Sequence, residues 1–260
     1  MKFYKPKFWD KKNFNLISLL LLPLSLIVII KNNYENSKIK KNYYDLRTIC
    51  VGNIYIGGTG KTPLVNKLAS HFKNKFKTFI IKKNYTSHQD EKKLLESNHK
   101  VIFEKTRELS LLKAEKEKAK IVIFDDGLQE KTINYDLKIV CFNSLKLEGN
   151  GFVIPAGPLR EKLSSIKNYD IALINGNINK ESKSFINRIK NINPNIKVFI
   201  GKYAPKNYLK LKKKKFIVFS GIGNPHTFTD TLKGMKIKCN EHEVFPDHYN
   251  YKESDLQKLK

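Results

Sequence analysis

From Thr48 onward, the chain alternates short apolar runs with charged segments that have helical spacing. Short apolar runs between helices are typical of buried parallel strands. The pattern predicts an α/β fold with a doubly wound, mostly parallel sheet and a ligand at the carboxyl ends of its strands. The expected strands lie at Thr48–Tyr55, Thr78–Ile81, Ile121–Phe124, Leu137–Phe142, Ile171–Ile174, Val198–Ile200 and Phe216–Phe219, with helices at Pro63–Phe72 and Leu109–Ala119.

An uncharged segment, Phe14 to Ile30, precedes this pattern and ends at Lys31. Its length is at the lower edge of what spans a bilayer, and Pro23 lies near its centre. A spanning helix, a helix lying in one leaflet and a buried helix all remain open. Trp9 and the lysines around it favour anchorage at a membrane interface.

The changes in composition along the sequence predict that the chain is divided into three parts. Residues 1–35 form a basic and hydrophobic membrane-associated segment, residues 36–210 the α/β core, and residues 211–260 a smaller, abbreviated C-terminal α/β unit. The lysine run Lys212–Lys215 lies beside the second boundary.

The composition indicates which classes of binding partner suit the chain, but it does not distinguish among them. Lys and Arg outnumber Asp and Glu by 50 to 24, a net charge of +26, which favours anionic lipid, phosphorylated substrates or nucleic acid. Nucleic-acid binding rests on charge alone, since the chain has no aromatic or Gly-rich RNA-reading motif. Cys50, Cys141 and Cys239 are too far apart in sequence for a CxxC zinc site and indicate reduced, structural thiols.

The segment Ile49 to Val65, ICVGNIYIGGTGKTPLV, has the order of a phosphate-binding loop: an apolar strand, glycines, Gly-Lys-Thr and a helix start. Glycines let backbone amides approach phosphate oxygens, Lys61 reaches the terminal phosphates, and the Thr62 hydroxyl suits Mg²⁺. Tyr55 stands where the strict pattern has glycine. The predicted nucleotide-binding residues are Tyr55, Ile56, Gly57, Gly58, Thr59, Gly60, Lys61 and Thr62.

Two further motifs carry charged side chains. In Ile121–Gln129, IVIFDDGLQ, an apolar strand ends in Asp125 and Asp126, which suits the metal of a nucleotide site. In Gly151–Glu161, GFVIPAGPLRE, a stiff loop presents Arg160 for phosphate and Glu161 for a metal or hydroxyl. The candidate contacts to substrate or phosphate are Arg107, Arg160 and Gln129.

The chain carries a set of motifs that follow one another in a fixed order: PKFW, LLLLPLS, VGNIYIGGTGKTP, DDGLQ, PAGPLRE, GIGNP and FPDHY. With this set, the chain resembles the tetraacyldisaccharide 4'-kinases of lipid A biosynthesis. The resemblance runs over nearly the whole chain. It implies a P-loop-type kinase on the cytoplasmic face of the bacterial inner membrane. Such an enzyme moves the γ-phosphate of ATP to the 4'-hydroxyl of a lipid disaccharide 1-phosphate, forming lipid IVA, with Mg²⁺ and without an obligate protein partner.

The resemblance also assigns roles. Gln89-Asp90-Glu91 is similar to the family's Gly-Asp-Glu motif, so Asp90 is the candidate base, and His248 in FPDHY is similar to the histidine that pairs with it. Lys61 completes the catalytic set. Thr62, Asp125, Asp126 and Glu161 form the expected metal set.

Three departures from the family accompany these matches. Glu130 replaces a usual histidine, so a phosphate or nucleotide contact is expected to be lost or replaced there. Lys83-Asn84-Tyr85 replaces Arg-Gly-Tyr, and Lys260 precedes an expected closing motif.

The alternative function is a membrane-associated P-loop NTPase that regulates a protein partner. The loop and the acids at the strand end would serve it equally well. PAGPLRE, Asp90 and FPDHY favour the kinase, because a simple nucleotide switch has no need of an acceptor site.

Overall fold

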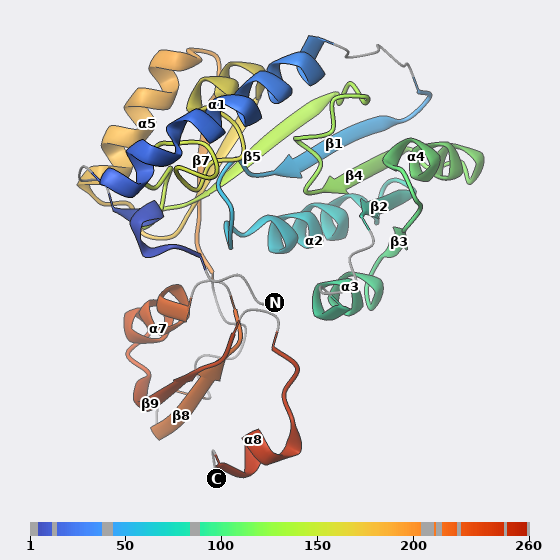
Figure 1. Cartoon of the computed structure of the whole chain (residues 1–260). Coiled ribbons are helices and arrows are strands. Elements are labelled where there is room, and N and C mark those ends of the chain that lie inside the picture. The colour runs from blue at the N-terminus through green and yellow to red at the C-terminus, as the bar shows by residue number, and fades with distance from the viewer. Residues whose placement is uncertain are drawn as a thin grey trace.

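The computed structural model describes residues 5–11, 15–37, 44–83, 89–203, 211, 215–222, 225–246 and 249–258. Its main body is a seven-stranded parallel sheet in the order β3-β2-β4-β1-β5-β6-β7 (Figure 1). This confirms the predicted doubly wound α/β fold. The strands are β1 (Arg47–Gly52), β2 (Thr78–Lys82), β3 (Lys100–Ile102), β4 (Ile121–Asp125), β5 (Leu137–Asn143), β6 (Ile171–Asn175) and β7 (Lys197–Gly201).

Helices cover both faces of this sheet because alternate residues of each central strand point to opposite sides. On β1, Ile49 and Val51 join one buried cluster, and Cys50 joins the other. The first cluster packs under α2 and α3; the second packs under α1, α4 and α5. The helices of the main body are η1 (Lys7–Asp10, 3-10), α1 (Leu16–Ser37), α2 (Lys61–Phe72), α3 (Gln89–Glu96), α4 (Arg107–Lys116), η2 (Leu163–Asn168, 3-10) and α5 (Lys180–Ile192).

The strand order places the predicted motifs side by side. Strand β1 lies between β4 and β5, and Val51 is in register with Asp125. On the other side of β4, Lys82 is in register with the same aspartate. Since all strands run parallel, the loop after β1 and the acids after β4 leave the sheet at one edge.

Helix α1 is longer than the expected segment and contains Pro23. Its start is capped by Asn15, whose side-chain oxygen accepts hydrogen bonds from the backbone amides of Ile17 and Ser18 at 2.9 and 3.3 Å. Among the described residues it is the one helix long and apolar enough to cross a membrane, over Leu16–Glu35 with a mean hydropathy of 1.9.

One side of α1 docks on the protein through polar contacts. The Ser25 hydroxyl donates to the carbonyl of Val153 at 2.8 Å and accepts from the amide of Ala156 at 3.1 Å. The apolar window is only 11% buried, so the purely buried helix that the sequence left open is not what the structure has. Its exposed apolar residues are Leu16, Ile17, Leu19, Leu20, Leu24, Leu26, Ile27 and Ile30.

The C-terminal region forms its own two-stranded parallel sheet, β8 (Lys215–Ser220) with β9 (Lys238–Val244). Helices α7 (Pro225–Gly234) and α8 (Glu253–Lys258) accompany it. In Figure 1 these elements lie below the seven-stranded sheet. The expected boundary between residues 210 and 211 stays a prediction, because 204–210 and 212–214 lie outside the described residues.

Candidate active site

The phosphate loop runs from the end of β1 to the start of α2, and its shape depends on glycine. Gly57 and Gly60 have φ of +129° and +84°. A Cβ on Gly60 would lie 2.5 Å from the Tyr203 hydroxyl and 2.6 Å from Nδ2 of Asn175. Asn175, at the end of β6, donates to the carbonyl of Thr59 at 2.6 Å and so fixes the loop from outside.

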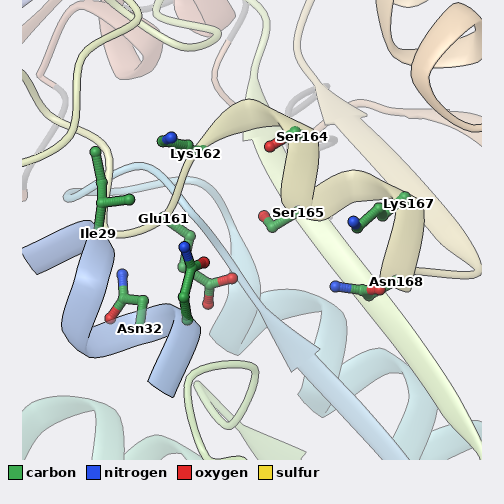
Figure 2. Close-up of a pocket in the computed structure, with 9 residues that line it drawn as sticks. Ile29, Asn32, Glu161, Lys162, Ser164, Ser165, Lys167 and Asn168 are labelled. Carbon is green, nitrogen blue, oxygen red and sulfur yellow. The ribbon is translucent and has the colours of Figure 1, made fainter. Parts of the chain in front are cut away.

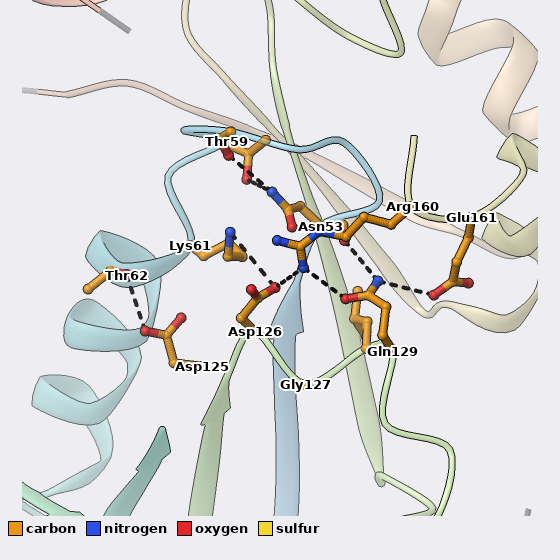
Figure 3. Close-up of polar contacts among 12 residues, drawn as sticks. Asn53, Thr59, Lys61, Thr62, Asp125, Asp126, Gly127, Gln129, Arg160 and Glu161 are labelled. Atoms are coloured by element: carbon orange, nitrogen blue, oxygen red, sulfur yellow. Dashed lines mark hydrogen bonds and ion pairs between the residues drawn. The ribbon is translucent and has the colours of Figure 1, made fainter. Parts of the chain in front are cut away.

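Asn53 holds the loop from inside. Its buried side-chain amide donates to the carbonyl of Gly57 and to the Thr59 hydroxyl, both at 3.1 Å (Figure 3). Its own carbonyl accepts from the Gln129 side chain at 3.0 Å, which ties the phosphate loop to the loop after β4. These hydrogen bonds fix the curvature of the loop.

Asp125 ends β4 beside the first turn of α2. The carboxylate is 1% exposed, and its Oδ2 accepts from the Thr62 hydroxyl at 3.2 Å and from Nζ of Lys82 at 2.6 Å. Its Oδ1 is buried and accepts no hydrogen bond within the described part of the chain. A buried carboxylate oxygen without a donor, next to a hydroxyl, is a suitable ligand for a hard cation.

Asp126 faces a different group of partners. Its Oδ1 accepts from Arg160 at 2.8 Å and lies 3.8 Å from Nζ of Lys61 (Figure 3). Arg107 donates to its backbone carbonyl at 2.6 Å. Burial opposes ionisation of this carboxyl, but the charges of Lys61, Arg160 and Arg107 outweigh that effect and hold its pKa below the usual value. Asp126 therefore gathers three cations at the phosphate loop.

Gln129 links this cluster to Glu161. Its side-chain oxygen accepts from Arg160 at 3.0 Å, and its amide donates to Oε1 of Glu161 at 3.1 Å. Glu161 also accepts from the Tyr169 hydroxyl at 3.0 Å and pairs with Lys131 at 3.5 Å. Figure 3 shows Glu161 on the far side of Gln129 from Thr62.

The structure thus brings together most, but not all, of the predicted residues. Lys61, Thr62, Asp125, Asp126, Arg107, Arg160 and Gln129 lie at one edge of the sheet. Asp90 is in the first turn of α3, but its side chain is outside the described part, and His248 lies outside the described residues. The proposed pairing of these two side chains therefore stays a prediction.

Glu130, where the resemblance leads one to expect histidine, pairs with Arg107 at 3.7 Å. Arg107 in turn holds the backbone of Asp126. Glu130 thus gives Arg107, the arginine that supports the loop after β4, a carboxylate as an ion-pair partner.

The metal prediction fits part of the geometry. Thr62 and Asp125 offer a hydroxyl and a free carboxylate oxygen, whereas Oδ1 of Asp126 is engaged by Arg160, and both Glu161 oxygens have protein partners. Within the described ranges, no group of three or more His, Cys, Asp or Glu side chains is placed to hold a metal ion. A metal role for Asp126 and Glu161 stays a prediction.

A small polar pocket of about 110 Å³ opens between α1 and η2 (Figure 2). Glu161 contributes to its wall, so the pocket adjoins the polar network of the phosphate loop. Its lining residues are Ile29, Asn32, Asn33, Glu161, Lys162, Ser164, Ser165, Lys167 and Asn168.

Residues 17–260 match the family model described as Tetraacyldisaccharide-1-P 4'-kinase. The chain belongs to this kinase family. The match covers the apolar helix, the phosphate loop and the C-terminal unit, so it confirms the resemblance drawn from the ordered motifs. The prediction that the chain is a tetraacyldisaccharide 4'-kinase is confirmed with it.

Full-length relatives agree with this family assignment. A tetraacyldisaccharide 4'-kinase of Pelagibacter ubique is 46% identical over all of this chain and 82% of its own length. One of Rickettsia akari is 34% identical over all of this chain and 83% of its own. The solved structure of LpxK from Aquifex aeolicus, in complex with ATP, superposes with a TM-score of 0.68 at 25% identity, covering 92% of this chain and 84% of that one.

Three side chains of this kinase site were not among the predicted residues. Lys82 directly follows the predicted strand Thr78–Ile81, so a cation at the carboxyl end of a strand is the sequence signal for this residue. Asn53 lies inside the loop motif itself, and its buried side-chain amide holds the curved backbone of the loop through a hydrogen bond. Asn175 lies more than a hundred residues from the loop, and the sequence carries no signal of that contact.

Proposed function

We propose that this chain transfers the γ-phosphate of ATP to the 4'-hydroxyl of a tetraacyldisaccharide 1-phosphate at the cytoplasmic face of the bacterial inner membrane. The supporting observation is the meeting of Lys61 and Arg160 on Asp126, beside the phosphate loop. In the transition state of phosphoryl transfer, the phosphoryl group carries charge on its equatorial oxygens. Cations that are already in position lower the free energy of this transition state.

Each side chain has a role in this proposal. Lys61 contacts the terminal phosphates from the helix start, and Arg160, on the rigid loop before Glu161, offers a planar fork to the transferred group. Asp126 keeps both cations in place beside the phosphate loop. Thr62 and Asp125 would hold Mg²⁺, which would offset the negative charge of the phosphates.

Asp90 is proposed as the base that accepts the proton of the acceptor hydroxyl, with His248 as its partner. The backbone gives this support: β2 ends at Lys82 beside Asp125, and the chain then enters α3 at Gln89. Asp90 therefore follows the strand that borders the metal-binding aspartate.

Membrane attachment is proposed through α1. Its outer side is apolar, and the basic chain favours an anionic leaflet. The pocket in Figure 2 lies between this helix and Glu161 and carries Lys162 and Lys167, which suits the polar, anionic head of a lipid. A head group reaching this pocket would not have to leave the interface.

The test is incubation of the membrane-bound protein with γ-labelled ATP and the disaccharide 1-phosphate. The expected product is a labelled, doubly phosphorylated lipid. Release of free phosphate without labelled lipid would instead support the nucleotide-dependent regulator.

A variant, Asp90→Asn, separates the base from nucleotide binding. We expect turnover to fall at least about 100-fold, the usual contribution of a general base, with ATP affinity within about twofold of the parent. Glu96→Gln on the same helix is the matched control. Unchanged turnover in Asp90→Asn would remove this residue from the role.

A further inference from the structure

The segment that precedes α1 is packed against the loops of the active site. Trp9 donates its indole N–H to the carbonyl of Pro155 at 3.0 Å, and the carbonyl of Trp9 accepts from the amide of Asn150 at 2.8 Å. Gly149 allows this approach, because a Cβ there would lie 2.5 Å from the Trp9 carbonyl oxygen. The 3-10 helix η1 is thereby fixed to the stretch that leads to Arg160.

The next residue, Asp10, reaches the phosphate loop. Its Oδ1 accepts from the Tyr55 hydroxyl at 2.6 Å, and its Oδ2 accepts from Nζ of Lys146 at 2.8 Å. Lys5 pairs with the same carboxylate at 2.5 Å and contacts the Tyr55 hydroxyl. Burial opposes ionisation of Asp10, but the two lysines hold its pKa below the usual value. The acceptor of the Tyr55 hydroxyl is therefore a carboxylate.

Tyr55 is the residue that stands where the strict loop pattern has glycine. Its side chain is in the core, with the residue only 3% exposed, and its backbone forms a bridge with Leu159. The flanking amide of Ile56 donates to Pro158 at 2.9 Å. A Cβ placed on Gly57 would lie in ordinary contact, 3.5 Å from the Tyr55 ring. The Tyr55 ring thus lies beside Gly57, the first glycine of the loop with a positive φ.

We propose that Asp10 is a positioning residue for the phosphate loop and acts through the Tyr55 hydroxyl. A charge-assisted hydrogen bond fixes the ring, the ring supports Gly57, and the loop amides keep the orientation that phosphate needs. The part of the chain that leads into the membrane helix thereby contributes to nucleotide binding. This inference rests on the proposed function, since it concerns the binding of ATP for that reaction.

The experiment compares Tyr55→Phe, Asp10→Ala and the double variant with the parent, using the full chain in detergent micelles. We expect each single variant to weaken ATP binding about tenfold, with turnover at saturating ATP within about twofold. The double variant should bind ATP no more weakly than either single one, because both changes remove one hydrogen bond.

Two further variants exclude a general effect on folding. Asp10→Asn keeps an acceptor oxygen and should recover part of the affinity. Asp170→Asn, whose carboxylate accepts from the amide of Lys138 at the opposite end of the strands, should bind ATP like the parent. Chemical denaturation is measured in parallel, so that ATP affinities are compared only between folded proteins.

Two results would overturn the inference: ATP affinity within twofold of the parent in both Tyr55→Phe and Asp10→Ala, or additive losses in the double variant. Failure of the proposed function has a different signature. In that case the parent itself would bind ATP but transfer no label to the lipid, whatever the variants do.

Discussion

The two aspartates at the end of β4 are adjacent in sequence but differ in their surroundings. Asp125 is buried between Thr62 and Lys82, with one oxygen free of hydrogen bonds in the described chain. Asp126 turns the other way through a left-handed backbone, φ +61°, and gathers Lys61 and Arg160. One aspartate suits a metal ion, and the other holds two cations beside the phosphate loop.

The Lys82–Asp125 pair gives a prediction about stability. Lys82→Met should lower the free energy of unfolding by about 3 kcal/mol, because it leaves a buried carboxylate without its counterion. The measurement is denaturant unfolding in detergent micelles without Mg²⁺. The exposed Lys120→Met is the matched control, and Lys82→Met/Asp125→Asn should regain more than half of the loss. A loss no larger than that of Lys120→Met would contradict the prediction.

The loop glycines give a second prediction. Gly60→Ala should destabilise the protein by about 2 kcal/mol or more, since a Cβ meets Tyr203 and Asn175 and the backbone is left-handed. Gly58→Ala meets no atom of the described residues within 4 Å and should change stability by less than about 0.5 kcal/mol. Thermal melting of the two variants side by side provides the comparison, and equal melting temperatures would show that Gly60 is not sterically required.

Sequence patterns located side chains well where one motif contained both the residue and its reason. Lys61, Thr62 and Asp125 are examples, since a strand, a loop and a helix start fix where they lie. Lys82 was missed because a lysine after a strand is usually a solvated end, and only the order β2-β4-β1 puts it on Asp125. The loop at Gly151–Glu161 led us to expect Glu161 beside a metal or a hydroxyl; its described contacts are to Gln129 and Tyr169, and its metal role stays a prediction.

At the scale of elements, α1 combines two kinds of surface. Ser18 and Ser25 are buried against the loop at 150–156, whereas the opposite side is formed by large apolar residues. A helix with this division is attached to the protein along one stripe and leaves the rest available to lipid.

Introducing negative charge on the outer side of α1 tests this division. Leu20→Glu/Ile27→Glu should reduce binding to anionic phospholipid vesicles at least about tenfold, because two carboxylates enter the apolar interface. The melting temperature should change little, since both positions are highly exposed. Vesicle co-sedimentation is the measurement. The control is Leu109→Glu/Leu112→Glu on α4, two exposed leucines changed in the same way. Equal retention of both double variants on vesicles would exclude α1 as the anchor.

The sequence predicts the elements with clear apolar runs, including the short run Val198–Ile200 of β7, but not β3 or α5. The strands β1, β4 and β5 follow from their hydrophobic runs, although β1 ends at Gly52 rather than Tyr55, because the loop begins at Asn53. The three-residue strand β3 was missed, since Lys100–Ile102 has too little pattern. Helix α5 was missed because its interior is polar apart from one stripe that includes Phe185 and Ile189.

For the whole molecule, several carboxyls tie the stability of the fold to pH. Asp10, Asp126 and Asp136 have pKa values below the usual one. For Asp136, burial opposes ionisation, but hydrogen bonds donated by the amide and hydroxyl of Thr48 outweigh it, with help from Arg47. A lowered folded pKa means that the unfolded chain binds more protons as the solution becomes acidic.

We therefore expect the contribution of these three carboxylates to the free energy of unfolding to be constant above about pH 5 and to fall as the pH drops through about 4 and below. Denaturant unfolding between pH 3 and pH 6 measures this. Asp136→Asn should flatten the decline, whereas Asp230→Asn on α7 should leave the slope as in the parent. A slope that is the same in both variants would mean that Asp136 does not contribute to the acid sensitivity.

The strand order also determines when, during translation, the nucleotide-binding site can form. Strand β1 leaves the ribosome early, but its neighbours β4 and β5 are encoded at residues 121–125 and 137–143. The amide of Arg160 then donates to the carbonyl of Ile54 at 2.6 Å. The apolar helix thus emerges well before the nucleotide cradle is assembled. With membrane attachment through α1 as proposed, a nascent chain would meet the bilayer first and gain its affinity for ATP afterwards.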